Sequence, residues 1–464
     1  MLTRLVLYTT ALLGAKALDS TYDSEVEHAF QSIRDSFPVP LVVDYATCSM
    51  SANEPCALDA MPDDETTVVY PGGETRCIFD QSISGNFGFQ VIPGNSSKGL
   101  LLFYQGGGAC WDEASTKVHV GFIQNGRTCN HSRVLSTPSH HHQLGLCTTS
   151  AVPSGGGVFD RNDEANPYHD WTVVQVLYCS GDVHGGAVVR DYNDKASKPV
   201  TQTGAANAQA VLDWILAQRE FASGTTEVVL TGSSAGCMGV QLWADSALEQ
   251  LSVLNFKRTA VIPDSFVGYF PPGTESPLIN QFGYCDTAII SPGLVADCKA
   301  NRLLFKDVVA NALGKNSEVP FAYINSKEDA VQIGYYIAIA ATFGRNVSSW
   351  ITPSMYYTGV NAMLEYYANN GHTNMLMYMV SSPMHTYMDD SFMYTAGAKG
   401  LFQQGDFGLI DYISTLPLWN GETLTGACDG ELQNLDDAPA LWTGYCDSAL
   451  DGREFTQGVQ QQIA

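Results

Sequence analysis

The sequence predicts an α/β fold with a mostly parallel central sheet flanked by helices. Residues 99–104, 171–178 and 227–230 are continuous apolar runs, which are typical of strands buried on both faces. Apolar residues recur at helical spacing in 205–219 and 235–251. Strands that alternate with helices pair in parallel and carry helices on both faces.

Three further runs extend this sheet, at residues 260–262, 321–324 and 375–380. No linker or repeat divides the chain between residue 61 and residue 464, so we expect a single domain there with loop insertions. Residues 18–60 contain three prolines and read as an N-terminal arm. Residues 115–165 are rich in Gly, Ser and His, and we expect a lid or an insertion over the sheet edge.

The composition excludes several classes of protein. The 464 residues are 45% hydrophobic and only 15% charged, which rules out disorder, a fibrous repeat and a coiled coil. The formal net charge of −25 leaves no basic footprint for nucleic acid. It also disfavours adsorption to anionic lipid.

The first 17 residues have the pattern of a secretory signal peptide. Arg4 precedes an apolar stretch from Leu5 to Leu13, and Ala15 and Ala17 supply the small residues of a cleavage site. No later segment has the roughly 18 uninterrupted apolar residues of a spanning helix. We therefore expect a secreted protein without a membrane span, cleaved near Ala17.

The 12 cysteines fit that destination, because an even count in an oxidising compartment favours disulfides. Zinc is the weaker interpretation, since the chain contains no CxxC pair. Proximity along the chain suggests the pairs Cys110–Cys129, Cys285–Cys298 and Cys428–Cys446, although connectivity cannot be deduced from sequence. Sequons at Asn95, Asn130 and Asn346 are glycosylation candidates.

Residues 232–236 form a G-x-S-x-G pentapeptide between the predicted strand 227–230 and the predicted helix 235–251. That strand–turn–helix setting is the one a nucleophile elbow requires, with Ser234 as the nucleophile. The alternative is a plain Gly/Ser turn. Ser233 is a neighbouring hydroxyl but stands in the wrong slot of the pattern.

A tetrahedral intermediate also needs amide donors for its oxyanion. In this arrangement one is the amide after the nucleophile, here Ala235, and another follows an earlier strand. Gly106, Gly107 and Gly108 end the strand 99–104 and allow close backbone approach. We expect Gly107, Gly108 and Ala235 to form the oxyanion hole. A phosphate-binding loop is a poor alternative, because no Walker lysine follows.

These segments together resemble the pectin acetylesterase family, which also includes the carboxylesterase Notum. The matching stretches are residues 102–110, 166–186, 232–236 and 325–332. The resemblance implies an α/β-hydrolase-type fold and a Ser-Asp-His triad. It assigns Ser234 as nucleophile, Asp329 of N-S-x-x-D-x-x-Q as acid and His385 of S-P-M-H-T as base.

The residues support that assignment, because Asp329 and His385 each follow a predicted strand in the chain order Ser, Asp, His. Asp264 also ends a predicted strand and is the rival acid, whereas His372 precedes its strand. Asp182 and His184 shape either the pocket or a turn. Residues 140–142 are three histidines that read as a solvated loop rather than a metal patch.

The resemblance also pairs Cys77 with Cys179. The chain departs from plant relatives at Ala109, where they have tryptophan, and at Cys237, where a further glycine is usual; both changes bear on the pocket wall. We expect no metal or organic cofactor, because acyl transfer by this triad needs none.

We expect a monomeric esterase that is secreted or located in the cell wall. Its expected activity is the removal of acetyl groups from a polysaccharide such as pectin. The alternatives are a Notum-like esterase that removes a fatty acyl group from a protein or lipid, and a non-catalytic binding protein of the same fold.

Overall fold

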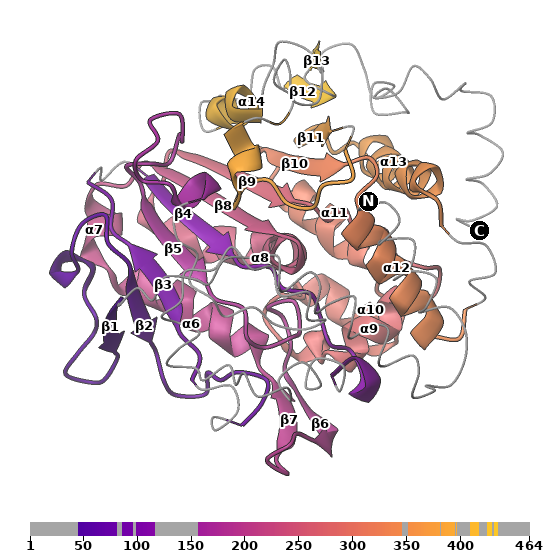
Figure 1. The fold of residues 1–464 in the computed structure, drawn as a ribbon, viewed down its shortest axis with the longest axis horizontal. Helices are drawn as coiled ribbons and strands as arrows, with labels where there is room; N and C mark the ends of the chain where they lie inside the picture. Colours follow the sequence, from indigo (N-terminus) through magenta and orange to yellow (C-terminus); the bar gives the residue numbers. More distant parts are fainter. Residues whose placement is uncertain are drawn as a thin grey trace, which may run out of the picture.

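A computed structural model describes residues 45–80, 86–95, 99–116, 156–345, 351–380, 382–394, 396, 409–416, 425–428 and 431–434. These residues form an 11-stranded sheet in the order β1-β2-β3-β5-β4-β8-β9-β10-β11-β12-β13, which crosses the molecule between helices (Figure 1). Its strands are β1 (Ala46–Ser49), β2 (Thr67–Tyr70), β3 (Phe89–Ile92), β4 (Gly99–Tyr104), β5 (Thr172–Val176), β8 (Glu227–Ser233), β9 (Arg258–Asp264), β10 (Phe321–Ser326), β11 (Met375–Val380), β12 (Thr425–Cys428) and β13 (Glu431–Asn434).

Most neighbouring strands are parallel, which confirms the predicted class. The strands from β5 through β4, β8, β9, β10 and β11 to β12 are parallel throughout. Only β3, which is antiparallel to β2 and β5, and the β12–β13 pair depart from this pattern among the described strands of the sheet.

Helices cover both faces of the sheet because its central strands are apolar on both sides. In β4, Leu100 and Leu102 face one buried cluster, whereas Leu101 and Phe103 face another. The first cluster packs against α6, α8, α11 and α13, and the second packs against α14 and two short 3₁₀ turns. The helices are α6 (Gly204–Ala217), α7 (Arg219–Ser223), α8 (Ala235–Leu251), α9 (Glu275–Gln281), α10 (Val295–Lys299), α11 (Phe305–Lys315), α12 (Ala330–Thr342), α13 (Pro353–Asn369) and α14 (Leu409–Thr415).

The topology gathers the ends of five neighbouring strands at one edge. The carboxyl ends of β4, β8, β9, β10 and β11 lie side by side, since these strands are adjacent and parallel. Asp264 is the last residue of β9. The other four strands lead into residues 106–108, which we call the glycine loop, and into the segments that carry Ser234, Asp329 and His385. The sheet therefore places every predicted catalytic segment at one rim.

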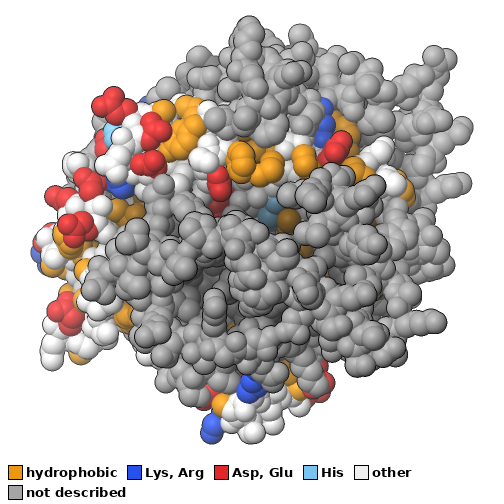
Figure 2. All heavy atoms as spheres, in the orientation of Figure 1, with side chains coloured by type: hydrophobic (Ala, Val, Ile, Leu, Met, Phe, Trp, Pro, Cys, Tyr) orange, Lys and Arg blue, Asp and Glu red, His pale blue; other side chains and the backbone are white. Residues whose placement is uncertain are grey.

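Outside this sheet, β6 (Val188–Asn193) and β7 (Pro199–Gln202) form an antiparallel pair that extends from the lower edge of the molecule in Figure 1. The periodicity of the sequence did not predict this hairpin. On the face drawn in Figure 2, acidic side chains gather along the left, over the β1–β3 end of the sheet. Across the described segments, we find no helix with both the length and the apolarity to cross a membrane.

Disulfides tie distant parts of the fold together. Cys77 is bonded to Cys179 and Cys285 to Cys298, as the sequence analysis expected. Cys110 is also in a disulfide, but its expected partner Cys129 lies outside the described residues, as does Cys446, the expected partner of Cys428.

Several further predictions concern residues outside the described part of the chain. They are the signal peptide at 1–17, the sequons Asn130 and Asn346, the three histidines at 140–142 and most of the segment 115–165. Asn95 is described and is exposed at the surface, where its side chain donates a hydrogen bond to Asp64.

Candidate active site

Ser234 occupies the turn between β8 and α8. Its φ of 58° and ψ of −121° are unusual for a residue with a side chain, and such strain clusters at functional sites. Ala235 is the first residue of α8, so its amide has no partner within the helix. The turn thus places the Ser234 hydroxyl beside an amide that is not used within the helix, in the strand–turn–helix setting that the pentapeptide predicted.

The glycine loop after β4 faces this turn. Gly107 and Gly108 have φ values of 145° and 78°, and Tyr178 Oη donates to the Gly108 carbonyl over 2.8 Å. His184 Nε2 donates to the carbonyl of Gln105 over 2.8 Å. His184 is fully buried, and burial lowers its pKa to about 4. It therefore supports the loop as a neutral side chain.

His385 and Asp329 are joined directly. The Nδ1 of His385 lies 2.8 Å from Oδ2 of Asp329 and 3.1 Å from Oδ1. Because a carboxylate only accepts hydrogen bonds, Nδ1 carries the proton and Nε2 is left as the basic nitrogen. Burial lowers the pKa of His385, but the charge of Asp329 and its hydrogen bond outweigh this effect, so the pKa is raised overall.

Asp329 is itself fixed by the helix that follows it. Its Oδ1 accepts hydrogen bonds from the amides of Val331 and Gln332 at the start of α12, at 3.0 and 2.9 Å. The side-chain amide of Gln332 donates to Oδ2 over 2.8 Å and to Asn325 Oδ1 over 2.7 Å. The N-S-x-x-D-x-x-Q motif therefore builds one network around the acid. The sequence contained Gln332 in this motif but gave no signal of its role.

The rival acid, Asp264, does not bond the histidine ring. Its carboxylate accepts instead from Ser233 Oγ, Ser265 Oγ and the amides of Tyr387 and Met388. His372 lies in the loop that precedes β11, away from these groups. Asp182 is buried and accepts from Ser180 Oγ and the Gly204 amide, so it shapes a turn.

One pocket connects the reactive groups. Ser234, Ala235, Gly108 and His385 all line it, whereas Gly107 does not. The Nε2 of His385 is buried and makes no hydrogen bond to any described residue, so a bond to Ser234 is not formed in this structure. Catalytic hydrogen bonds are often long before substrate binds. Both side chains therefore border one cavity.

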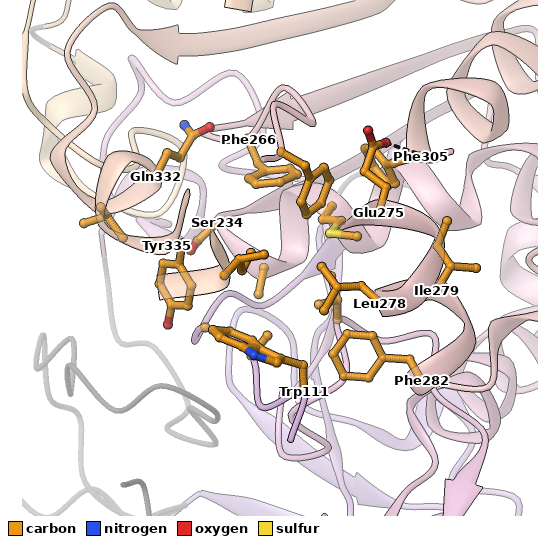
Figure 3. Close-up of a pocket in the computed structure, with 18 of the residues that line it drawn as sticks. Trp111, Ser234, Phe266, Glu275, Leu278, Ile279, Phe282, Phe305, Gln332 and Tyr335 are labelled. Carbon is orange, nitrogen blue, oxygen red and sulfur yellow. Dashed lines mark hydrogen bonds between the residues drawn. The ribbon is translucent and has the colours of Figure 1, made fainter. Parts of the chain in front are cut away.

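The rest of the pocket is mostly apolar. Figure 3 shows Trp111 and Phe266 beside Ser234, with Leu278, Ile279 and Phe282 across the cavity. It holds about 730 Å³ of atom-free space, part of it open to solvent. Of the two positions at which the chain departs from plant relatives, Ala109 lines the pocket and Cys237 does not. The Cys237 thiol is fully buried and reduced, and it lies 3.1 Å from the Phe266 carbonyl.

Glu275 is the acidic group of this pocket. Its Oε2 accepts a hydrogen bond from the Phe305 amide at the start of α11, over 2.8 Å (Figure 3). Burial raises the pKa of Glu275 to about 7, against the lowering effect of that bond and of Lys306. The carboxyl is therefore partly protonated near neutral pH. Because the lining comes from segments far apart in sequence, periodicity could not reveal it.

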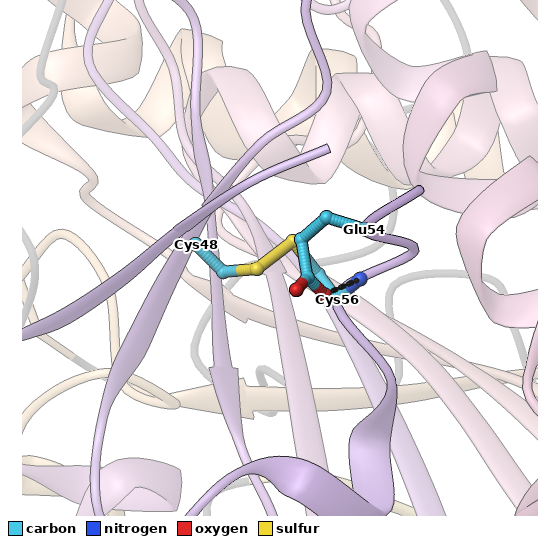
Figure 4. Close-up of side chains that lie close together, drawn as sticks. All are labelled: Cys48, Glu54 and Cys56. Atoms are coloured by element: carbon cyan, nitrogen blue, oxygen red, sulfur yellow. Dashed lines mark hydrogen bonds between the residues drawn. A yellow bond between two sulfur atoms is a disulfide. The ribbon is translucent and has the colours of Figure 1, made fainter. Parts of the chain in front are cut away.

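A cluster that resembles a metal site is already satisfied. Cys48, Glu54 and Cys56 lie together at the β1 edge, but the two sulfurs form a disulfide (Figure 4). Glu54 accepts a hydrogen bond from the Cys56 amide over 3.0 Å. A disulfide offers no thiolate, so these residues do not fit a metal ion.

Known proteins show similarity to this chain over part of its length. Palmitoleoyl-protein carboxylesterase NOTUM from Schmidtea mediterranea is 28% identical over 161 residues, which are 34% of this chain and 26% of that protein. The protein of the same name from Mus musculus is 28% identical over 186 residues, 39% of this chain and 32% of its own. The matches thus span about a third or less of these relatives.

Among solved structures, the Wnt deacylase Notum from Drosophila has a TM-score of 0.48 and 19% identity, and the match covers 76% of this chain and 96% of that one. The family model described as Pectinacetylesterase matches residues 75–379. That span includes the glycine loop, the Ser234 turn and Asp329, while His385 lies just beyond it. Because the model covers well over half of the sequence, the chain belongs to the pectinacetylesterase family.

Proposed function

We propose that the protein is a secreted serine carboxylesterase that hydrolyses esters with an apolar acyl group. One observation carries this proposal, which is that Ser234 and His385 open into the same mostly apolar pocket. The His385–Asp329 bond and the free amide of Ala235 complete the parts that acyl transfer needs.

The mechanism follows from the positions of these groups. His385 Nε2 takes the proton of Ser234 as the hydroxyl oxygen attacks the ester carbonyl. The amides of Gly108 and Ala235 stabilise the oxyanion, with Gly107 as the further donor expected from the sequence. The alcohol leaves with the proton from His385, and the same histidine then activates water to release the acid. Asp329 keeps the ring oriented and stabilises the imidazolium.

The apolar lining of the pocket favours an acyl group larger than acetyl. A two-carbon acyl group would contact few of the apolar side chains that line the pocket, which include Phe266, Phe270, Leu278 and Phe282. Each buried methylene of a longer chain contributes about 0.8 kcal/mol of transfer free energy. Binding energy of that size can be used for acyl-chain selection.

A second candidate is an esterase that removes acetyl groups from a polysaccharide such as pectin. The Pectinacetylesterase family model favours it. The formal net charge of −25 opposes binding of a polyanion such as pectin, unless the bound segment meets a local basic patch. A protein that binds esters without hydrolysing them is the third possibility.

A chain-length series distinguishes these functions. We expect kcat/KM for nitrophenyl esters to rise from acetyl to octanoyl by about 10- to 100-fold, and to disappear in Ser234→Ala. A maximum at acetyl, together with release of acetate from pectin, would establish the second candidate instead. A folded protein that hydrolyses no ester and is not labelled by a fluorophosphonate would establish the third.

A further inference from the structure

Asp264 contacts both of the segments that carry the reactive side chains. It is fully buried at the end of β9. Its Oδ2 accepts hydrogen bonds from Ser233 Oγ over 3.1 Å and from the amides of Tyr387 and Met388 over 2.8 Å each. Its backbone carbonyl accepts from the amide of Ser234 over 2.9 Å. One residue is thus bonded to the serine turn and to the loop that follows His385.

Ser265 adds a second connection between the same segments. Its hydroxyl donates to Asp264 Oδ1 over 2.7 Å and accepts from the amide of Thr386, next to His385, over 3.2 Å. Ser234, Ser265 and Thr386 all have positive φ, at 58°, 66° and 73°. Residues with side chains keep such a conformation only where surrounding contacts hold them, and Asp264 or its neighbour supplies a contact to each.

We propose that Asp264 is a positioning residue that fixes the separation and orientation of Ser234 and His385. The inference rests on the proposed esterase function. Asp264 does not act as the acid of the triad, because the Nδ1 of His385 is bonded to Asp329. It also lies outside the pocket lining, so it has no contact through which to bind the acyl group.

The chemistry of the four contacts explains why a carboxylate stands at this position. Every group that points at the two oxygens is a donor, and an ionised carboxylate is a pure acceptor. An asparagine there would carry no charge and keep a single acceptor oxygen. Its NH₂ group would face one of the four present donors, so at least one of these bonds would be lost or reversed in direction. Burial and the charge of Asp389 raise the pKa of Asp264 to about 6, so the acceptor is ionised above that pH.

Asp389 supplies a matched control. The charged groups around His385 are Asp329, Asp264 and Asp389, and all three raise its pKa. Oδ1 of Asp389 is buried and makes no hydrogen bond to any described residue. Asp389→Asn therefore removes a neighbouring charge without removing a bond between the two segments.

The test compares Asp264→Asn with Asp389→Asn on one ester substrate at about pH 8, which is above the pKa of Asp264. We expect Asp264→Asn to lower kcat by about 10- to 100-fold with KM unchanged within about twofold. We expect Asp389→Asn to keep the plateau kcat. Both variants should move the acid limb of kcat/KM to lower pH, because each removes a negative charge near His385.

Three outcomes would overturn the inference. These are a folded Asp264→Asn with full kcat, a loss in which KM rises instead of kcat falling, and an equal loss of kcat in Asp389→Asn. If Asp264→Asn does not fold, Ser233→Ala and Ser265→Ala decide. The first removes one bond to Asp264, and the second removes the bond to Asp264 and the bond from the Thr386 amide. Full kcat in both variants overturns the inference. A wild-type protein without ester turnover or fluorophosphonate labelling would instead contradict the proposed function.

Discussion

Gly106 lies directly against Ser234. A Cβ at position 106 would stand 3.0 Å from the Cβ of Ser234 and 2.6 Å from the carbonyl oxygen of Ser233. A backbone atom cannot move away as a flexible side chain can. The glycine loop and the serine turn are therefore packed against each other, and this contact fixes the position of Ser234 relative to the expected oxyanion donors.

Gly106→Ala should impair catalysis through this contact. We expect a loss of about 10- to 100-fold in kcat, because a displaced nucleophile is poorly aligned, with a loss of about 1–3 kcal/mol in the free energy of unfolding. Gly334→Ala is the control, since position 334 in α12 has nothing within 4 Å of an added Cβ. It should gain about 0.5–1 kcal/mol. Equal effects at both sites would contradict the packing argument.

The backbone of Ser234 predicts a difference between two inactive variants. Both Ser234→Ala and Ser234→Gly should lose at least about 10⁴-fold in kcat. Ser234→Gly should nevertheless unfold with a free energy about 1 kcal/mol higher than Ser234→Ala, because only glycine adopts φ 58°, ψ −121° without strain. Thermal unfolding of the two proteins checks this, and a less stable glycine variant would argue against stored strain at the turn.

The pH profile should reflect the raised pKa of His385. The imidazole must be neutral to accept the Ser234 proton, so kcat/KM should fall on the acid side at a pH above 6.5, the ordinary pKa of histidine. Asp329→Asn removes the charge whose effect on the pKa of His385 outweighs that of burial. The acid limb of kcat/KM should therefore move to lower pH, and kcat should fall by about 10⁴-fold. An acid limb that does not move in the variant would remove Asp329 as the group that sets this pKa.

The same raised pKa has a consequence for stability. A histidine whose folded-state pKa exceeds its unfolded value contributes stability that is fully present below the unfolded pKa. That contribution is lost as the pH rises through the folded-state pKa. The stability difference between wild type and His385→Ala should therefore shrink over that interval, as chemical denaturation at several pH values would show.

Glu275 should make acyl selectivity depend on pH. Its pKa of about 7 means that the pocket gains a negative charge as the pH rises through neutrality. The ratio of kcat/KM for octanoyl over butyryl esters should then fall, because a charge in a mostly apolar pocket disfavours an apolar chain. Taking a ratio cancels the titration of His385. Glu275→Gln should abolish the pH dependence of the ratio, and a ratio that changes equally in both proteins would exclude this role.

Two disulfides should differ in their contribution to stability. Cys77–Cys179 closes a separation of 102 residues, whereas Cys48–Cys56 closes only 8. Chain entropy predicts a loss of about 4.7 kcal/mol for a loop of about 100 residues and about 2.5 kcal/mol for the short one. Paired Cys→Ala variants in urea would measure both losses. A larger effect from the short loop would contradict the entropic account.

Much of the sheet was predictable from local sequence. The runs 99–104 and 375–380 coincide with β4 and β11, and the helix expected at 235–251 coincides with α8. These segments are buried on both faces or start at a strong turn signal, so their pattern is unambiguous. The helix expected at 205–219 is instead α6 followed by the short α7, with Gln218 extended between them.

The site was predictable only in part, for a physical reason. Ser234, Asp329 and His385 stand in short local motifs, and the strand order brings them to one rim. The pocket is built from side chains such as Trp111, Phe266 and Phe282, whose proximity depends on how loops and helices pack. The contacts of Asp264 were likewise hidden, because two of its four donors are backbone amides more than a hundred residues away along the chain.

The buried thiol of Cys237, three residues after Ser234, can report local opening of the turn that carries Ser234. Cys237 is the reduced cysteine among the described residues and has no exposed surface. An alkylating reagent can reach it only when the start of α8 and the segment around Phe266, which lies against the thiol, move apart or open locally. The rate at which the Cys237 peptide gains the alkyl group, followed by mass spectrometry, would therefore report how often the region around the Ser234 turn opens. The measurement needs no substrate.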